Sequence, residues 1–387
     1  MDLARALKRG AAPRKIPGLG WRDPGGGVHL AEAVAVADIE HGPPPAVDLI
    51  SQAYYRRRRR RTLVITASRG CPFACSYCCM TREGPLPYRR RPVASVLAEI
   101  DAGAALDDTP VGFIDFEDEN LALDKAWLHA LLTGIEARFG TDPPELRAMN
   151  GLYAPSLDEA LVTHMDRAGF KSLNLALASA APDQLKRFNR PDLRHALERC
   201  LAWAAARGMD AVAYTIAGAP MQDPRTSVDD LAYLARRRVL AGVSIYYPAP
   251  GSRDYALCER RGWLPEAPSL MRSSALPLDT TTSRLQSVTL LRLGRLVNFI
   301  KAVIDRGDPL PTAASCGEII DPEMDRYEMG RLLLGAFLAD RRLRGVDGEG
   351  RVYAQPQDGA LCRHFHGRMA GRRLHGVTAV GALRYPP

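Results

Sequence analysis

Residues 62–78 read TLVITASRGCPFACSYC, a β-branched run followed directly by a cysteine-rich loop. The run at 62–67 predicts a buried strand. The loop places Cys71, Cys75 and Cys78 in a C-x3-C-x2-C spacing. Thiolates so close in sequence can converge on one iron–sulfur cluster. Because a [4Fe–4S] cluster has four irons and this loop supplies three ligands, the fourth iron would stay open to a small molecule.

Two other interpretations of the cysteines remain. Three or four close cysteines can hold zinc, but zinc fingers usually add a second Cys/His pair further along, and none follows at that distance. A redox pair of Cys75 and Cys78 would leave Cys71 unexplained. Cys79 is adjacent to Cys78, so we expect its side chain to point elsewhere.

Strands alternate with helical patterns for about 200 residues after this loop. Such alternation predicts a parallel sheet with right-handed crossovers. We therefore expect an α/β fold, a partial barrel of six βα units, with function at the carboxyl ends of the strands. The cysteine loop, which follows the first strand, would lie on that face. The expected strands are 62–67, 111–116, 145–150, 171–178, 210–218 and 243–251.

Composition divides the chain into three parts. Residues 1–60 are rich in Gly and Pro and predict an N-terminal arm. Residues 61–265 hold the core barrel, and 266–387 a helical and irregular C-terminal subdomain, with a long amphipathic helix at 283–307. We expect the arm and the subdomain to cap the mouth of the barrel.

Bulk composition limits the partners. The net charge is +8, and the arginine run 56–61 is a candidate nucleic-acid patch. Arginine is abundant throughout, however, so we do not expect a nucleic-acid partner. No apolar run reaches the roughly 18 residues that span a bilayer, and the N-terminus lacks a signal-peptide pattern, which predicts a cytoplasmic protein without a membrane partner. Four of the eight cysteines crowd into nine positions, which is atypical of a disulfide framework.

The C-x3-C-x2-C loop with an aromatic residue before its last cysteine resembles the signature of the radical S-adenosylmethionine (SAM) superfamily. The resemblance implies a [4Fe–4S] cluster on Cys71, Cys75 and Cys78, with the methionyl amine and carboxylate of SAM on the open iron. It also implies reductive cleavage of SAM, a 5′-deoxyadenosyl radical that abstracts a hydrogen atom, and a reductant such as flavodoxin or ferredoxin. Tyr77 would pack near the adenine.

Later segments resemble one branch, the cobalamin-binding radical SAM enzymes. The segments 17–28 and 38–50 resemble the linker that leads from the cobalamin domain into the barrel. There are two departures from the branch. No cobalamin domain is recognisable, and Ala178 stands where the branch often has Glu, so we expect Ser179 to take part of that role. The resemblance rests on RGCPFACSYC, YRRRP (88–92), IDFEDENLALDKAW (114–127), and the segments 173–191, 216–220 and 247–264.

Acidic residues follow the second strand. In the family this loop holds the methionyl amine, so we expect at least one of Glu117, Asp118 and Glu119 to bind the cofactor, Asp118 and Glu117 first. A solvated loop is the alternative. Asn150 and Tyr214 could face the barrel interior, although core packing or strand termination is favoured for both.

Two features of the C-terminal part are weaker candidates. Cys362, His364 and His366 alternate, which would place them on one face of a strand and makes a second metal site conceivable. Cys316 could donate a hydrogen atom to a radical; otherwise it is an ordinary buried thiol, like Cys200 and Cys258.

Three functions remain open. The first is a radical SAM enzyme that abstracts a hydrogen atom from a small-molecule or peptide substrate without cobalamin. The second is a radical methyltransferase or methylthiotransferase acting on RNA or another macromolecule. No cysteine precedes Cys71, which argues against the methylthiotransferases. The third is a non-catalytic iron–sulfur carrier, which the acids after the second strand and the YPAPGS segment disfavour.

Overall fold

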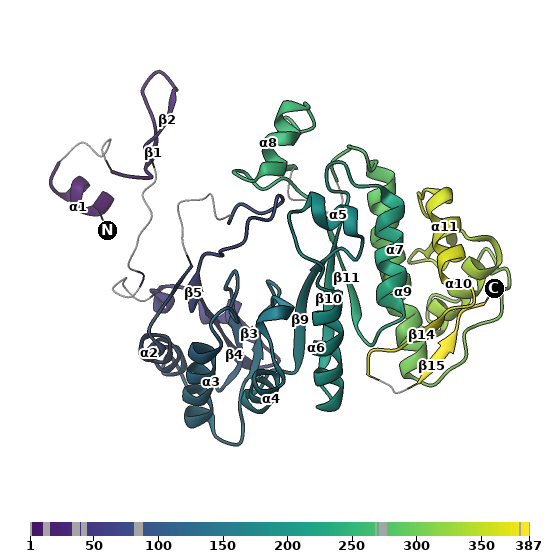
Figure 1. Ribbon diagram of the computed structural model, residues 1–387, viewed down its shortest axis with the longest axis horizontal. Helices are drawn as coiled ribbons and strands as arrows, with labels where there is room; N and C mark the ends of the chain where they lie inside the picture. The colour runs from purple at the N-terminus through teal and green to yellow at the C-terminus, as the bar shows by residue number, and fades with distance from the viewer. Residues whose placement is uncertain are drawn as a thin grey trace.

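Six short segments form the strands of one curved parallel sheet in the computed structural model (Figure 1). β4 (Arg60–Ile65), β7 (Val111–Phe116) and β8 (Glu145–Arg147) are hydrogen-bonded in that order, and so are β9 (Ser172–Ala178), β10 (Asp210–Ala217) and β11 (Leu240–Ile245). Two isolated parallel bridges, Leu146 to Phe170 and Leu152 to Leu175, join the two sets. The expected partial barrel of six βα units is confirmed. The structure describes residues 2–10, 16–32, 39, 45–80, 88–267, 269–270, 277–378 and 381–386.

Five helices cover the outside of the sheet, and their ends follow local sequence signals. Asp124, Asp158 and Asp223 each accept a hydrogen bond from a backbone N–H in the first turn of the helix that follows them. Gly140 ends its helix at φ +57°, and Gly169 ends the next at φ +117°. The helices are α2 (Val93–Ala104), α3 (Lys125–Phe139), α4 (Glu159–Ala168), α6 (Arg194–Ala206) and α7 (Pro224–Ala235).

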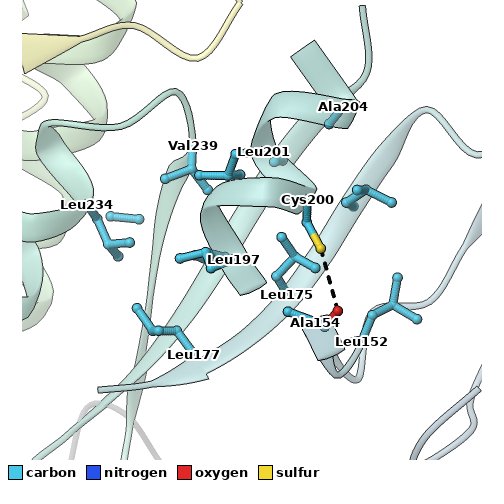
Figure 2. Close-up of a cluster of buried hydrophobic side chains, with 14 of the residues drawn as sticks. Leu152, Ala154, Leu175, Leu177, Leu197, Cys200, Leu201, Ala204, Leu234 and Val239 are labelled. Carbon is cyan, nitrogen blue, oxygen red and sulfur yellow. Dashed lines mark hydrogen bonds between the residues drawn. The ribbon is translucent and has the colours of Figure 1, made fainter. Parts of the chain in front are cut away.

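The core lies between these helices and the sheet. Figure 2 shows one part of it, where Leu197 and Leu201 of α6 pack over Leu175 and Leu177 of β9. Cys200 is fully buried there, and its thiol lies 3.6 Å from the carbonyl oxygen of Ala154 (Figure 2). Its position agrees with the expected role of an ordinary buried thiol.

The C-terminal part packs on the flank of the barrel. α9 (Arg284–Asp305) lies against β11 and α7, and α11 (Gly359–Met369) lies against α7 and α9 (Figure 1). The buried Lys301 donates hydrogen bonds to the carbonyl oxygens of Arg237 (2.6 Å) and His375 (2.9 Å), which ties this part to the end of α7. The expectation that it caps the barrel mouth is therefore wrong. Its other elements are α10 (Arg326–Asp340), β12 (Arg344–Val346), β13 (Val352–Ala354), β14 (Arg373–His375) and β15 (Ala382–Arg384).

The N-terminal arm holds α1 (Asp2–Lys8) and the hairpin of β1 (Gly20–Arg22) and β2 (Val28–Leu30), which project away from the barrel (Figure 1). Part of the linker-like segment 38–50, residues 38 and 40–44, lies outside the described residues. Within the part of the chain that is described, no helix has the length and apolar character that crossing a membrane requires. The boundaries after residues 60 and 265 stay predictions.

Candidate active site

A cavity of about 500 Å³ opens where the six parallel strands end. Each strand, or the loop after it, supplies lining residues, so the whole barrel shapes this space. Its lining residues are Cys71, Phe73, Cys75, Tyr77, Cys78, Met80, Glu119, Asn120, Met149, Asn150, Gly151, Tyr153, Ala176, Ala178, Arg190, Tyr214, Ile216, Ser244 and Tyr247.

The three predicted cysteines all line this cavity. Burial raises the pKa of Cys71, and it raises the pKa of Cys78 to about 11. All eight cysteines are free thiols. No three His, Cys, Asp or Glu side chains of the described residues are grouped closely enough to hold a single ion. The thiols thus surround a space, an arrangement that fits a multi-iron cluster better than one zinc ion.

Two later segments of the chain hold the cysteine loop. The backbone N–H of Ser76 donates to the carbonyl oxygen of Phe188 (3.0 Å), just after α5 (Pro182–Arg187). The Ser76 hydroxyl donates to Asp254 (3.1 Å), at the start of α8 (Arg253–Arg260). Arg187 in turn pairs with the other oxygen of Asp254 at 2.9 Å. Contacts that are distant in sequence therefore fix the thiols.

Arg190 is a lining residue that sequence analysis did not single out. Its guanidinium donates to the carbonyl oxygen of Ala176 (2.9 Å) and lies 3.5 Å from the sulfur of Cys75. No described carboxylate forms an ion pair with it. A half-buried cation without a carboxylate favours a negative partner in the cavity, and three thiolates would provide one. Its position in FNRP, a segment already in the family resemblance, was the available signal.

The three acids after β7 have separate roles. Asp118 is 3% exposed and accepts hydrogen bonds from the backbone N–H of Ala67 (3.2 Å) and the hydroxyl of Ser68 (2.5 Å), as well as the Ser68 backbone N–H. Burial raises its pKa to about 6. Asp118 does not line the cavity, which corrects its expected place as a first cofactor ligand: it fastens the end of β7 to the start of the cysteine loop.

The neighbours of Asp118 point elsewhere. Glu117 is exposed and does not itself line the cavity, although it accepts from the amide of the lining residue Asn150 (3.1 Å). Glu119 lines the cavity and accepts from the backbone N–H of Gly70 (3.1 Å). Asn120, which sequence analysis missed, also lines the cavity; it is 3% exposed and its Oδ1 has no hydrogen-bond partner. Of the predicted acids, only Glu119 can meet a ligand there.

The segment after β9 also differs from expectation. Ala178 lines the cavity in a left-handed backbone conformation, with φ +67°. Ser179 is fully buried, and its hydroxyl donates to Asp230 (2.9 Å), which also accepts from the backbone N–H of Ala180 (2.6 Å). The expected role of Ser179 toward the cofactor is thus not supported by its position. Burial raises the pKa of Asp230 to about 7.

Tyr77 lines both the main cavity and an adjoining side cavity of about 270 Å³. Its ring meets Phe188 edge-on, with centroids 5.0 Å apart. The side cavity is largely apolar and aromatic; besides Tyr77 it is lined by Cys78, Cys79, Ile216, Ser244, Ile245, Tyr246, Tyr247 and Ala249. The exposed Cys79 lines only this side cavity, in agreement with the expectation that it points away from the other three cysteines.

Asn150 and Tyr214 both line the main cavity. Core packing or strand termination was the favoured interpretation, so their position is a correction. Tyr214 donates from its hydroxyl to Asn174 (3.0 Å), which orients the ring within the barrel.

The C-terminal candidates lie elsewhere. Cys316 is in the loop between α9 and α10 and lines neither cavity, so its position does not support hydrogen-atom donation there. Cys362, His364 and His366 lie on α11, not on a strand, and the helix turns them to different partners. These are Gln357 (3.3 Å), Asp229 (3.5 Å) and Arg341 (2.8 Å), respectively. The idea of a second metal site is wrong.

An open barrel of six parallel strands, with three cysteine thiols facing a cavity at the strand ends, is the arrangement of a radical SAM enzyme. Residues 65–233 match the model of the Radical SAM superfamily. This part of the chain is thus similar to the superfamily, whose members bind a [4Fe–4S] cluster and SAM.

Three of the similar proteins are methyltransferases or cobalamin-dependent enzymes by their names. An uncharacterized methyltransferase, PH0819 from Pyrococcus horikoshii, is 22% identical over 66% of this chain and 55% of its own length. TsrM from Kitasatospora setae, a radical SAM methyltransferase solved with cobalamin and a [4Fe–4S] cluster, is 21% identical (TM-score 0.51; 69% of this chain, 53% of TsrM). OxsB, a cobalamin-dependent SAM radical enzyme, is 15% identical (TM-score 0.59; 88% and 54%). The chain spans about half the length of these proteins.

We predict that Asp118→Ala destabilises the fold. The change leaves three buried donors of Ala67 and Ser68 without an acceptor, which costs about 3 kcal/mol in the free energy of unfolding. Glu117→Ala, next to it and exposed, should change that free energy by less than about 0.5 kcal/mol. Urea unfolding of both variants measures the difference; equal effects would show that Asp118 does not fasten the loop.

Asp230 predicts a pH dependence of stability. Its folded-state pKa of about 7 lies above the ordinary 3.8, so the folded state binds the proton more tightly. The free energy of unfolding should therefore fall between about pH 4 and pH 7, by about 4 kcal/mol at full ionisation. Asp230→Asn keeps an acceptor for Ser179 and Ala180 but removes the titration. A wild-type-minus-variant difference that stays flat across this range, measured by urea unfolding, would contradict the assignment.

Proposed function

We propose that this protein cleaves SAM reductively at a [4Fe–4S] cluster held by Cys71, Cys75 and Cys78, and abstracts a hydrogen atom from a small-molecule or peptide substrate. The observation that carries this proposal is the convergence of the three thiols, the unpartnered Oδ1 of Asn120 and the guanidinium of Arg190 on one cavity of about 500 Å³. When bound, the cluster supplies the electron that splits SAM into methionine and a 5′-deoxyadenosyl radical.

The surrounding residues would bind and orient SAM. The Oδ1 of Asn120 and the carboxylate of Glu119 are acceptors for the methionyl ammonium group. Arg190 offsets the negative charge of the thiolates and carries free donor capacity, since its Nε has no partner. The apolar side cavity behind Tyr77 suits the adenine ring, in keeping with the position that the family resemblance implies for Tyr77.

The volume of the main cavity favours a small reacting group. Cluster and cofactor would fill most of about 500 Å³, so the substrate would enter from the rim. Met149 and Tyr247 form part of that rim, at 51% and 49% exposure. A reductant such as flavodoxin or ferredoxin would supply the electron. A carrier function is the weaker alternative, because a carrier has no use for a substrate-sized cavity beside its thiols.

Radical methyl transfer with cobalamin is the second candidate. It is favoured by the names of the relatives, among which TsrM and PH0819 are methyltransferases and OxsB is cobalamin-dependent. The substrate could then also be a macromolecule.

The cluster should depend on all three motif cysteines. After anaerobic reconstitution, Cys71→Ala, Cys75→Ala and Cys78→Ala should each lose iron and sulfide and fail to release 5′-deoxyadenosine from SAM under strong reductant. Cys79→Ala, the matched control one position further on, should keep both properties. A full cluster in the triple variant would refute the proposal. An intact wild-type cluster that releases no 5′-deoxyadenosine would favour the carrier.

Cobalamin binding separates the two enzyme candidates. Hydrogen-atom abstraction without cobalamin predicts no tight binding of cobalamin, whereas radical methylation predicts stoichiometric binding. The measurement is titration with hydroxocobalamin, followed by gel filtration and visible absorption. Stoichiometric co-elution of cobalamin with the protein would favour radical methylation over the first candidate.

A further inference from the structure

A cavity of about 220 Å³ lies in the C-terminal part, between α9, α10 and β12. Four arginines line it: Arg292 and Arg295 from α9, Arg342 just before β12, and Arg344 within β12. We call it the arginine cavity. No described carboxylate lines it. Apart from Gln355, its other lining residues are apolar: Leu296, Phe299, Gly330, Leu333, Leu334, Phe337 and Leu343.

Among the described residues, only one of the four arginines forms an ion pair. Arg344 pairs with Asp340 at 2.5 Å, and Arg292 donates to the carbonyl oxygen of Pro356. The side chains of Arg295 and Arg342 have neither a hydrogen bond nor an ion pair with any residue that the structure describes. Burial and the neighbouring charge of Arg295 lower the pKa of Arg292. Arg292, Arg295 and Arg342 therefore line one hollow without an ion pair of their own to any described residue, and the last two are exposed to solvent. The nearby Asp340 lies outside the lining and acts on the side chain of Arg342 only through its charge.

The apolar lining residues form what we call the apolar floor, which depends on a close approach of α9 and α10. A Cβ at Gly330 of α10 would lie 2.5 Å from the ring of Phe299 of α9, so only glycine lets this ring pack against α10. The ring and Phe337 form an apolar surface directly beside the guanidinium groups. A ligand with one anionic group and one apolar group would satisfy both parts of the wall.

We propose that the arginine cavity binds the phosphoryl group of a small phosphomonoester. A phosphomonoester carries close to two negative charges and three acceptor oxygens, which several arginines can share, whereas a carboxylate satisfies one or two. The esterified group would lie on the apolar floor. The cavity is a hollow bounded by three elements, which suits a single head group better than a polymer. α10 lies beyond α7 and α9 from the barrel strands, so this ligand does not meet the radical chemistry (Figure 1).

The test uses phenyl phosphate as the probe and isothermal titration calorimetry of the full chain. We expect saturable binding at one site, weakened about tenfold by Arg295→Gln or Arg342→Gln, since each loses a charge-assisted contact. Arg295→Lys, which keeps the charge, should lose less. Arg363→Gln is the matched control, because Arg363 is exposed on α11 outside the arginine cavity. Thermal unfolding followed by circular dichroism confirms that each variant is folded.

Comparison ligands separate the sources of binding. Inorganic phosphate should bind more weakly than phenyl phosphate, and equal affinity would remove the role of the apolar floor. Benzoate binding as tightly as phenyl phosphate would overturn the phosphoryl assignment. The proposal also fails if phenyl phosphate shows no saturable binding, or if Arg363→Gln weakens it as much as the cavity variants do. If a single-stranded RNA binds more tightly than phenyl phosphate and is weakened by the same arginine variants, the arginine cavity is a nucleic-acid site and the phosphomonoester proposal is wrong.

Discussion

The carboxylate of Asp118 connects two neighbouring strands at the point where the chain leaves regular structure. It accepts from the backbone of Ala67 and Ser68 and from the Ser68 hydroxyl, all just before the cysteine loop. The loop has few hydrogen bonds of its own, so its starting direction depends on this fastening. Glu119 continues the contact at Gly70. The direction of the three thiols toward the cavity follows from where these two acids hold the backbone.

Much of the fold was accessible from sequence because its signals are local. The strands between 62 and 218 are short β-branched or apolar runs, and two of the helices between them, α3 and α4, begin at Asp residues and end at Gly. The last strand begins at Leu240, three residues before the expected start at 243, because the helix before it ends early, at Ala235. The three cysteines lie within eight consecutive positions, so sequence alone could assign them to one ligand set, although distant contacts hold the loop in place.

The remaining parts of the site are set by tertiary contacts. The sequence cannot show which of Glu117, Asp118 and Glu119 meets a ligand. At the end of β7, Glu117 points outward, Asp118 bonds to the neighbouring backbone and Glu119 lines the cavity. Asn120 and Arg190 owe their importance to burial that no local pattern encodes. The segment around Cys362 was a different error. Its polar alternation suggested a strand, but Leu361, Phe365 and Met369 recur at helical spacing after the N-cap Asp358, and that stronger period decides the structure.

The order of the strands along the sheet is their order along the chain, so the barrel is built from contacts of short sequence separation. Its units can form one after another as the chain emerges. The cysteine loop does not share this property. Ser76 can form its hydrogen bonds only after Phe188 and Asp254 are in place, and Asp254 lies 178 residues downstream. The cysteine loop is thus among the last parts to be fixed in place, after nearly the whole barrel has formed around the thiols.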